Sequence, residues 1–139
     1  MLKAELLQPE VLEALGTSGH GSQVLIADGN YPFATGSNES ARKVYLNLSP
    51  GIVTVPQVLA AVSQSIVIES ATVMEPASGE EPPIFEDFRS LLGETDLEKK
   101  GRFEFYEAAK EESVSLVIAT GEERTYGNIL LTIGVVEPE

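Results

Sequence analysis

His20 is the only histidine of this chain, and it lies in Ser18-Gly19-His20-Gly21-Ser22, just before the apolar run Val24–Ile26. An imidazole can give and take a proton near neutral pH, which suits general acid–base catalysis. The flanking glycines allow backbone and ligand to approach closely. Asp28 follows the apolar run and adds a titratable carboxylate. These residues are candidates for proton transfer, although a histidine in a glycine-rich turn can equally have no chemical role.

A second candidate group lies near the carboxyl terminus, where Tyr126 and Asn128 flank Gly127 just before the apolar run Ile129–Leu131. A tyrosine hydroxyl and a side-chain amide can both donate and accept hydrogen bonds, as sugar hydroxyls require. The glycine permits close backbone approach. The alternative interpretation is a turn that contains a packed tyrosine.

Other catalytic patterns find little support. Ser18 and Ser22 flank the histidine without the G-x-S-x-G elbow of a hydrolase. The chain has neither a phosphate-binding G-x-x-x-x-G-K loop nor the carboxylate spacing of an EF-hand. It contains no cysteine, which excludes disulfides, thiolate catalysis and zinc–cysteine sites.

Charge restricts the partners. Twenty-two acidic residues against nine basic ones give a formal net charge of −13, which disfavours nucleic acid and anionic membrane surfaces. A neutral ligand such as a sugar is compatible with this charge. The first seven residues carry Lys3 and Glu5 and lack the apolar core of a signal peptide, so the expected location is cytoplasmic.

The length of 139 residues suits one domain, 1–139, and 42% hydrophobic residues suffice for a core. Strands are predicted at 24–27, 43–48, 65–74, 114–119 and 128–136. Helices are predicted at 9–15, 54–64, 85–92 and 103–112. This alternation predicts an α/β fold, a single compact domain with a mixed, mostly parallel sheet flanked by helices. In such sheets ligands gather beyond the carboxyl ends of the strands, where Asp28, Thr120 and Gly121 are expected.

Taken together, the motifs resemble a known family. Gly19-His20-Gly21 with Val24 to Pro32 is similar to the amino-terminal signature of the ribose pyranase / fucose mutarotase family. Three later segments resemble that family's helix and closing signature: Arg102 to Glu107, Thr120-Gly121-Glu122 and Tyr126 to Leu131. Each motif is weak alone, but their order and separations are specific, and the likeness runs from Met1 to about Val136.

The resemblance implies which residues form the site. The family's proton-transferring histidine corresponds to His20. Its sugar-binding positions correspond to Asp28, Arg102, Tyr126, Gly127 and Asn128. Arginine at 102 and glycine at 127 make the chain more similar to the fucose branch, because ribose-type members tend to have histidine and alanine there. Ser22 departs from the aspartate of many members, and Asn30 from the histidine of some fucose-type ones.

The resemblance also implies an activity, namely interconversion of the anomers of a free sugar by ring opening, without a cofactor or metal. L-fucose or a related sugar is the expected substrate. It implies a homo-oligomer, commonly a ring-shaped decamer, in which a neighbouring subunit can complete the site. The alternatives are D-ribose pyranase activity and a non-catalytic sugar-binding or transport-accessory role.

Overall fold

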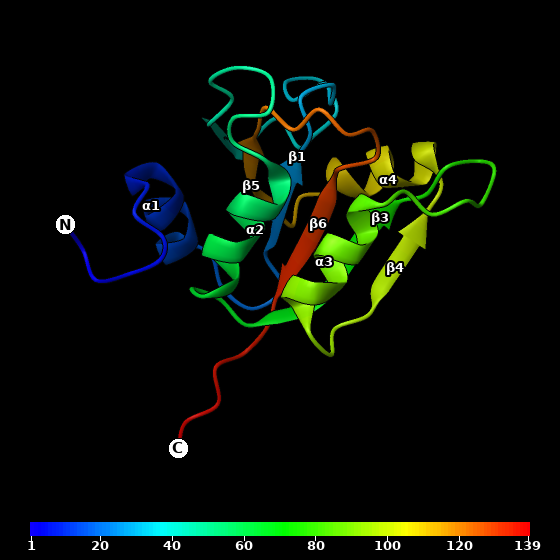
Figure 1. The fold of residues 1–139 in the computed structure, drawn as a ribbon. Helices are drawn as coiled ribbons and strands as arrows, with labels where there is room; N and C mark the ends of the chain where they lie inside the picture. Colours follow the sequence, from blue (N-terminus) through cyan, green and yellow to red (C-terminus); the bar gives the residue numbers. More distant parts are fainter.

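The computed structural model describes residues 1–139 and contains one six-stranded sheet with four helices (Figure 1). The strands are β1 (Gln23–Ala27), β2 (Arg42–Tyr45), β3 (Ile68–Met74), β4 (Leu97–Lys100), β5 (Val114–Ala119) and β6 (Ile129–Ile133). The helices are α1 (Pro9–Thr17), α2 (Val55–Ser63), α3 (Ile84–Leu92) and α4 (Arg102–Ala109). The predicted α/β fold is therefore confirmed. None of the helices has the length and apolar character needed to span a membrane.

The sheet is mixed but mostly parallel, as predicted. Its strand order is β2-β5-β1-β6-β3-β4. β1 pairs in parallel with β5, β5 with β2, and β3 with β4, whereas β6 runs antiparallel to both of its neighbours. In Figure 1, β1 points upward and β6 downward. The carboxyl ends of β1 to β5 and the start of β6 consequently share one edge of the sheet, which we call the upper edge.

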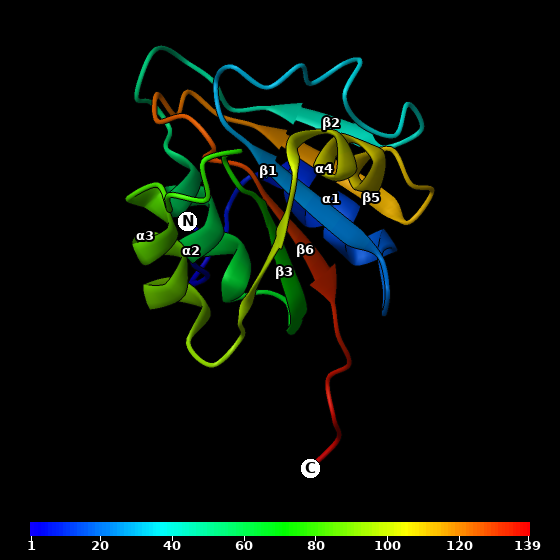
Figure 2. The same ribbon diagram turned by 90° about the vertical axis from the view of Figure 1, so that its right-hand side faces the viewer.

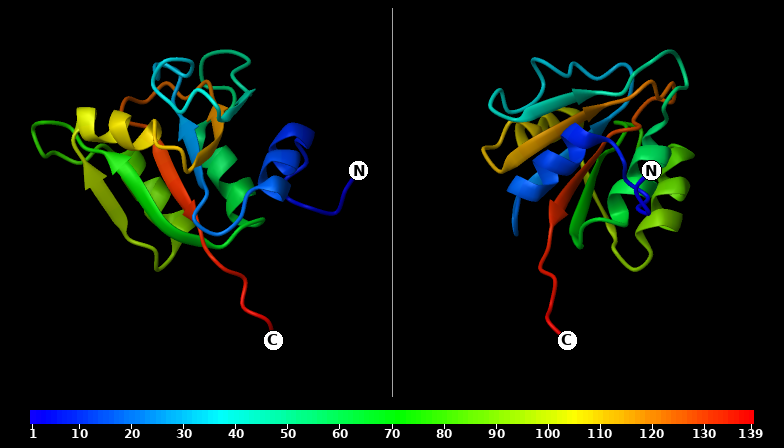
Figure 3. Two further views of the ribbon diagram at one scale, coloured as in Figure 1. Left: turned by 180° about the vertical axis from the view of Figure 1, so that it is seen from behind. Right: turned by 90° about the vertical axis from the view of Figure 1, so that its left-hand side faces the viewer.

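Helices cover both faces of the sheet. The larger buried cluster joins α1, α2 and α3 to one face, with Val11, Leu59 and Phe88 among its members. The smaller cluster joins α4 to the opposite face through Phe105 and Ala109. Figure 2 shows α2 and α3 on one side of the sheet and α4 on the other, and the rear view in Figure 3 shows α4 against its face. The buried strands β1 and β5 thus lie between two apolar layers, which explains their continuous apolar sequences.

Local sequence explains where the helices begin. Thr54 caps α2 by accepting a hydrogen bond from the Gln57 backbone amide, and the Gln57 side chain accepts one from the Thr54 amide. This reciprocal capping box satisfies two amides that have no partner within the helix. The Gln8 side chain accepts a hydrogen bond from the Val11 amide at the start of α1, where Pro9 occupies the first helical position.

The structure corrects several predicted boundaries. β2 ends at Tyr45 rather than at residue 48, β3 begins at Ile68 rather than at 65, β6 covers 129–133 rather than 128–136, and α4 ends at Ala109 rather than at 112. β4 was not predicted at all. Its sequence is Leu-Glu-Lys-Lys, and as an edge strand with one partner it needs no apolar pattern. In α4, Phe105 and Ala109 are buried, whereas Phe103 is 76% exposed.

Candidate functional site

The predicted sugar-binding residues meet at the upper edge of the sheet. Asp28 directly follows β1 and Asn128 directly precedes β6. These two strands are antiparallel neighbours, so the two residues become adjacent although they are 100 positions apart. The Asp28 backbone amide donates to Asn128 Oδ1 at 2.7 Å. Because this bond uses the amide oxygen, the Asn128 nitrogen Nδ2 is left to donate to a ligand.

The Asp28 carboxylate ties two loops together. Its Oδ1 accepts a hydrogen bond from the Asn30 amide at 3.0 Å, and its Oδ2 accepts one from the Gly127 amide at 3.1 Å. The residue is only 3% exposed. Burial raises the pKa of Asp28, and the nearby Glu122 charge adds to this, while the amide hydrogen bonds oppose it. Asp28 therefore both lines the site and organises its backbone.

A pocket of about 250 Å³ opens beside these residues. Four of the predicted positions line it, namely Asp28, Arg102, Tyr126 and Asn128. The fifth, Gly127, contributes its backbone amide to Asp28. Five lining residues were not predicted as site residues: Asn30, Tyr31, Met74, Thr125 and Tyr106. The combination of aromatic side chains with a few convergent polar groups is typical of small-molecule sites.

α4 supplies one wall of the pocket. Arg102 is its first residue, and its guanidinium carbon lies 5.8 Å from the centre of the Tyr106 ring. Tyr106 follows one helical turn later and so lies on the same face, a spacing that would have allowed its prediction. The Tyr31 ring is 5.5 Å from the Tyr106 ring, and its hydroxyl donates to the Gly36 carbonyl at 2.6 Å. Burial raises the pKa of Tyr31, so it remains a neutral wall residue.

Tyr126 occupies an unusual backbone conformation. Its φ of 60° lies in the left-handed region, which only glycine adopts readily. The side chain is half-buried and packs against the cluster that α4 forms with the sheet. A tyrosine that retains such a conformation at the rim of a pocket points to a functional constraint.

Thr120 and Gly121 also lie at the upper edge, but they hold the structure together. The Thr120 hydroxyl donates to the Ala27 carbonyl at 2.8 Å. The Gly121 amide donates to the Val53 carbonyl, and its own carbonyl accepts from the Gly51 amide. A Cβ at position 121 would lie 2.3 Å from the Ser49 carbonyl oxygen, so only glycine fits there.

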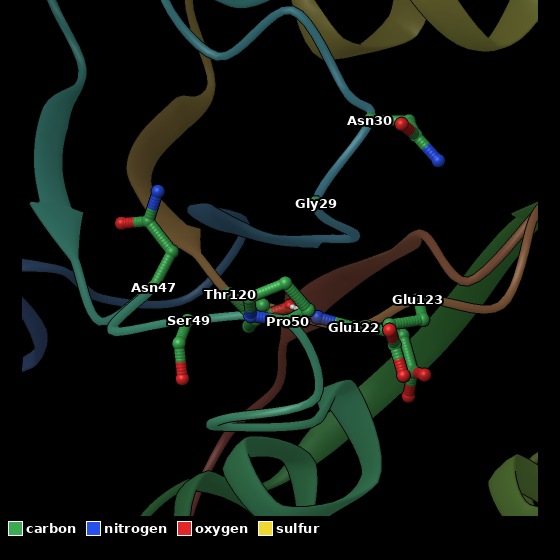
Figure 4. Close-up of a pocket in the computed structure, with 9 residues that line it drawn as sticks. Gly29, Asn30, Asn47, Ser49, Pro50, Thr120, Glu122 and Glu123 are labelled. Carbon is green, nitrogen blue, oxygen red and sulfur yellow. Dashed lines mark hydrogen bonds between the residues drawn. The ribbon is translucent and has the colours of Figure 1, made fainter.

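A larger hollow of about 460 Å³ lies next to the pocket (Figure 4). Asn47 and Ser49 line it on the side of β2, Glu123 lines the opposite side, and Asn30 is shared with the first pocket. Pro50 is the only apolar side chain that lines this hollow, and no aromatic residue does. A sugar ring has an apolar face that packs against aromatic side chains, so the smaller pocket with Tyr106 and Tyr126 is the better candidate.

His20 lies away from this pocket. It belongs to the turn between α1 and β1, and the neighbouring Gly21 amide donates to the carbonyl of Ile133, the last residue of β6. β1 separates His20 from Asp28, and its five residues alone span about 16 Å at roughly 3.3 Å each. The imidazole is 59% exposed, and its Nε2 lies 2.9 Å from Oε1 of Glu69. Within one chain, His20 and Asp28 cannot act on the same ligand.

No group of three or more His, Cys, Asp or Glu side chains is arranged to hold a metal ion. The polar groups at the pocket are instead amides, tyrosines, a threonine hydroxyl, one guanidinium and one buried carboxylate. Such groups bind hydroxyls and can exchange protons with them.

Comparison with known proteins identifies the family of this chain. Residues 1–136 match the model of the RbsD / FucU transport protein family. The chain belongs to this family. It is 37% identical to the fucose mutarotase of Bos taurus in an alignment 150 positions long, gaps included, which covers 96% of this chain and 92% of that protein. It is 31% identical to the D-ribose pyranase of Geobacillus thermodenitrificans, with 97% and 98% coverage.

A solved structure supports the same assignment. The fucose mutarotase from Streptococcus pneumoniae, crystallised in complex with L-fucose, is 28% identical to this RbsD / FucU family member. The two folds superpose with a TM-score of 0.84 over 99% of this chain and 100% of that chain. The family resemblance expected from the motifs is therefore confirmed along almost the whole length.

Proposed function

We propose that this RbsD / FucU family member is a mutarotase that interconverts the anomers of a free monosaccharide, with L-fucose or a related sugar as substrate. The observation that carries the proposal is the pocket at the upper edge, where Asp28, Arg102, Tyr126 and Asn128 converge. The proteins it resembles include fucose mutarotases and D-ribose pyranases, and both names describe isomerisation of a free sugar.

Each group at the pocket suits part of a sugar. Asn128 Nδ2 and the Arg102 guanidinium are donors for sugar oxygens. Tyr126 and Tyr106 offer aromatic surface for the apolar face of the ring. Arg102 is the only cationic residue that lines the pocket, and Asp28 is the only acidic one, so their charges can cancel. This balance, in a chain with a net charge of −13, favours a neutral sugar over a phosphorylated one.

His20 is our candidate for the proton-transferring group. Because it lies at the lower edge of the sheet, it must reach a sugar held at the upper edge of a second copy of the chain. The imidazole Nε2 donates a hydrogen bond to the Glu69 carboxylate, which leaves Nδ1 free to face the sugar. Glu69 supplies the carboxylate that contacts the imidazole, a role that the resemblance would give to an aspartate in place of Ser22.

The proposed reaction is ring opening followed by closure on the other face. A base removes the proton of the anomeric hydroxyl while an acid protonates the ring oxygen. The bond between the anomeric carbon and the ring oxygen breaks, which leaves an open-chain aldehyde. Rotation about the adjacent carbon–carbon bond and the reverse proton transfers then close the other anomer. Each positioned proton transfer typically contributes about 10²–10⁴-fold, so His20 with one hydroxyl or water suffices for a modest acceleration.

Exposed apolar residues support a head-to-tail homo-oligomer. Val67 is exposed just before β3, and Val135 and Val136 are exposed just after β6, at the lower edge to which His20 belongs. Tyr45 and Ile52 are exposed toward the upper edge. Contact between the two different edges is a heterologous interface, which closes into a ring when the rotation permits. We propose that such a ring, a decamer in size, brings His20 of one subunit to the sugar pocket of the next. The apolar face of α1 packs on its own sheet and does not serve this contact.

NMR saturation exchange between sugar anomers, with and without the protein, tests this function. We expect accelerated exchange, faster for L-fucose than for D-ribose. If no fucose, ribose or galactose sample exchanges faster than in buffer, the chain is not a mutarotase for these sugars. Sugar-dependent chemical shifts without exchange would indicate the non-catalytic sugar-binding or transport-accessory role. A clear preference for ribose would indicate D-ribose pyranase activity instead.

A further inference from the structure

The left-handed backbone of Tyr126 needs support from its surroundings. A tyrosine at a φ of 60° is strained, and such a residue retains its conformation only when neighbouring contacts over-determine it. On the carboxyl-terminal side of Tyr126, the Gly127 amide donates a hydrogen bond to Asp28 Oδ2. The contacts on the other side come from Glu122 and Arg124, neither of which lines the sugar pocket.

Hydrogen bonds between Glu122 and Arg124 fix the backbone just before Tyr126. Arg124 donates from Nε to Glu122 Oε2 at 3.2 Å and from Nη2 to Oε1 at 3.1 Å, so the pair is bidentate. The Arg124 backbone amide also donates to Oε2, at 3.2 Å. Glu122 is buried, which alone would raise its pKa, but the Arg124 hydrogen bonds and the Val55 amide hold the pKa below its ordinary value. The carboxylate is therefore ionised and fully paired.

Arg124 also fixes this segment to a helix. Its Nη1 donates to Oδ2 of Asp87, in the first turn of α3, at 2.8 Å. α3 is itself anchored in the core by Ile84, Phe85 and Phe88, each fully buried. The guanidinium thus connects a buried carboxylate in the loop to a rigid helix.

The backbone next to Tyr126 rests directly on this arrangement. A Cβ added at Gly127 would lie 3.0 Å from the Arg124 carbonyl oxygen, 3.1 Å from Glu122 Cγ and 3.2 Å from Ile84 Cδ1. These distances leave little room for the segment to shift. A displacement of Glu122, Arg124 or α3 would therefore be transmitted to Tyr126.

We infer that the ion-pair chain Glu122–Arg124–Asp87 positions Tyr126 for the sugar. This inference rests on the proposed function, in which Tyr126 contacts the substrate. Arg124 and Asp87 are then positioning residues, which act on the sugar only through Tyr126. Loss of Asp87 should remove the exposed ion pair with Arg124, and loss of Arg124 should remove both of its ion pairs.

The test uses protein labelled with 3-fluorotyrosine, whose four tyrosines give four ¹⁹F signals. The Tyr126 signal is assigned from the one that disappears in Tyr126→Phe. The variants are Arg124→Gln and Asp87→Ala. Their matched controls are Arg89→Gln and Glu86→Ala, because Arg89 and Glu86 form an exposed ion pair on the same helix, α3, without contacting the loop.

We expect the Tyr126 signal to shift or broaden in Arg124→Gln and, less strongly, in Asp87→Ala, and to stay unchanged in both controls. Anomer exchange should fall about tenfold in Arg124→Gln, within the 10²-fold loss that a misplacement of about 1 Å can cause. The loss should appear mainly as weaker sugar binding.

An unchanged Tyr126 signal in Asp87→Ala and Arg124→Gln would overturn the inference. Equal loss of exchange in the Arg89→Gln control would do the same, because it would reveal a general effect on stability. The ¹⁹F measurement needs no activity, so it remains decisive if the wild-type protein fails to accelerate exchange and the proposed function is wrong. Asp87→Ala replaces an exposed side chain and should fold even if Arg124→Gln leaves buried Glu122 unpaired and unfolds the protein.

Discussion

At the scale of single residues, the structure separates two candidates that the sequence placed eight positions apart. Asp28 is buried and bonded to two loops, whereas His20 is exposed and bonded to Glu69. Asp28 therefore contributes to the shape of the pocket. Because its imidazole is exposed, we expect His20 to contribute little to stability.

His20→Ala should reduce the acceleration of anomer exchange by about 10²-fold or more, because a positioned proton transfer is lost. The free energy of unfolding should change by less than about 0.5 kcal/mol, since the side chain is exposed. Saturation-exchange NMR and urea unfolding measure the two quantities. Near wild-type exchange in His20→Ala would show that another group transfers the proton.

Asp28 should make stability depend on pH in a defined direction. Its pKa is raised in the folded protein, mainly by burial, so folding disfavours the charged form. Such a group's contribution is fully present below the ordinary aspartate pKa of about 3.9 and is lost as pH rises through the folded pKa. The unfolding free energy of the wild type relative to Asp28→Asn should thus decrease from pH 4 upward. Urea unfolding of both proteins at one concentration and several pH values measures this. Parallel pH curves would contradict it.

At the scale of elements, the upper edge is assembled from loops that the parallel strands bring together. Thr120 and Glu122 are buried and Gly121 is half-buried, and the three residues lie between the ends of β1 and β5 and the segment 49–53. These residues build the frame on which Tyr126, Gly127 and Asn128 rest. The Thr120-Gly121-Glu122 motif, which resembles the family signature, therefore serves the structure of the site rather than sugar binding.

Gly121→Ala should destabilise the fold by at least about 1–3 kcal/mol, because the added methyl would meet backbone oxygens of Ser49 and Ile52 at 2.3 and 2.7 Å. Gly16→Ala is the matched control. Gly16 lies in α1 with nothing within 4 Å of an added Cβ, so alanine should stabilise by roughly 0.5–1 kcal/mol. Thermal and urea unfolding compare the two variants. Wild-type stability in Gly121→Ala would mean that the segment 49–53 can move.

At the scale of the whole molecule, the proposed mechanism needs a second copy of the chain, because His20 and Asp28 lie at opposite edges of the sheet. We expect a mass well above that of the monomer in light scattering, at both low and high salt. Salt screens the repulsion between subunits that each carry a charge of −13 and leaves apolar contacts intact. A monomer that retains mutarotation would disprove the shared site.

Subunit mixing gives a sharper test. His20→Ala and Asn128→Ala should each be impaired alone. When they are unfolded together and refolded at equal concentration, about one quarter of the sites should combine an intact His20 with an intact Asn128 if the contact is heterologous. Exchange should recover to about that fraction of wild type. A mixture of His20→Ala with His20→Gln serves as the control and should show no recovery. Absence of recovery in the first mixture would place both residues in one chain's site.

Much of the fold was predictable because it is encoded locally. The apolar runs of β1 and β5 predict buried parallel strands, and Pro9 and Thr54-Val55-Pro56 predict the starts of α1 and α2. The charged edge strand β4 was not predictable in this way. Its four residues pair with β3 through backbone atoms, which leave no mark on side-chain patterning.

The α/β class, the family and the predicted sugar-binding residues could be inferred from motif order and hydrophobic periodicity, which are properties of the chain. Which of these residues meet depends on the three-dimensional fold. The antiparallel pairing of β1 and β6 brings Asp28 to Asn128, and the length of β1 keeps His20 away from both. The contacts of Glu69 with His20 and of Arg124 with Asp87 join residues 49 and 37 positions apart. Such long-range contacts depend on strand order and helix packing, which no local pattern specifies.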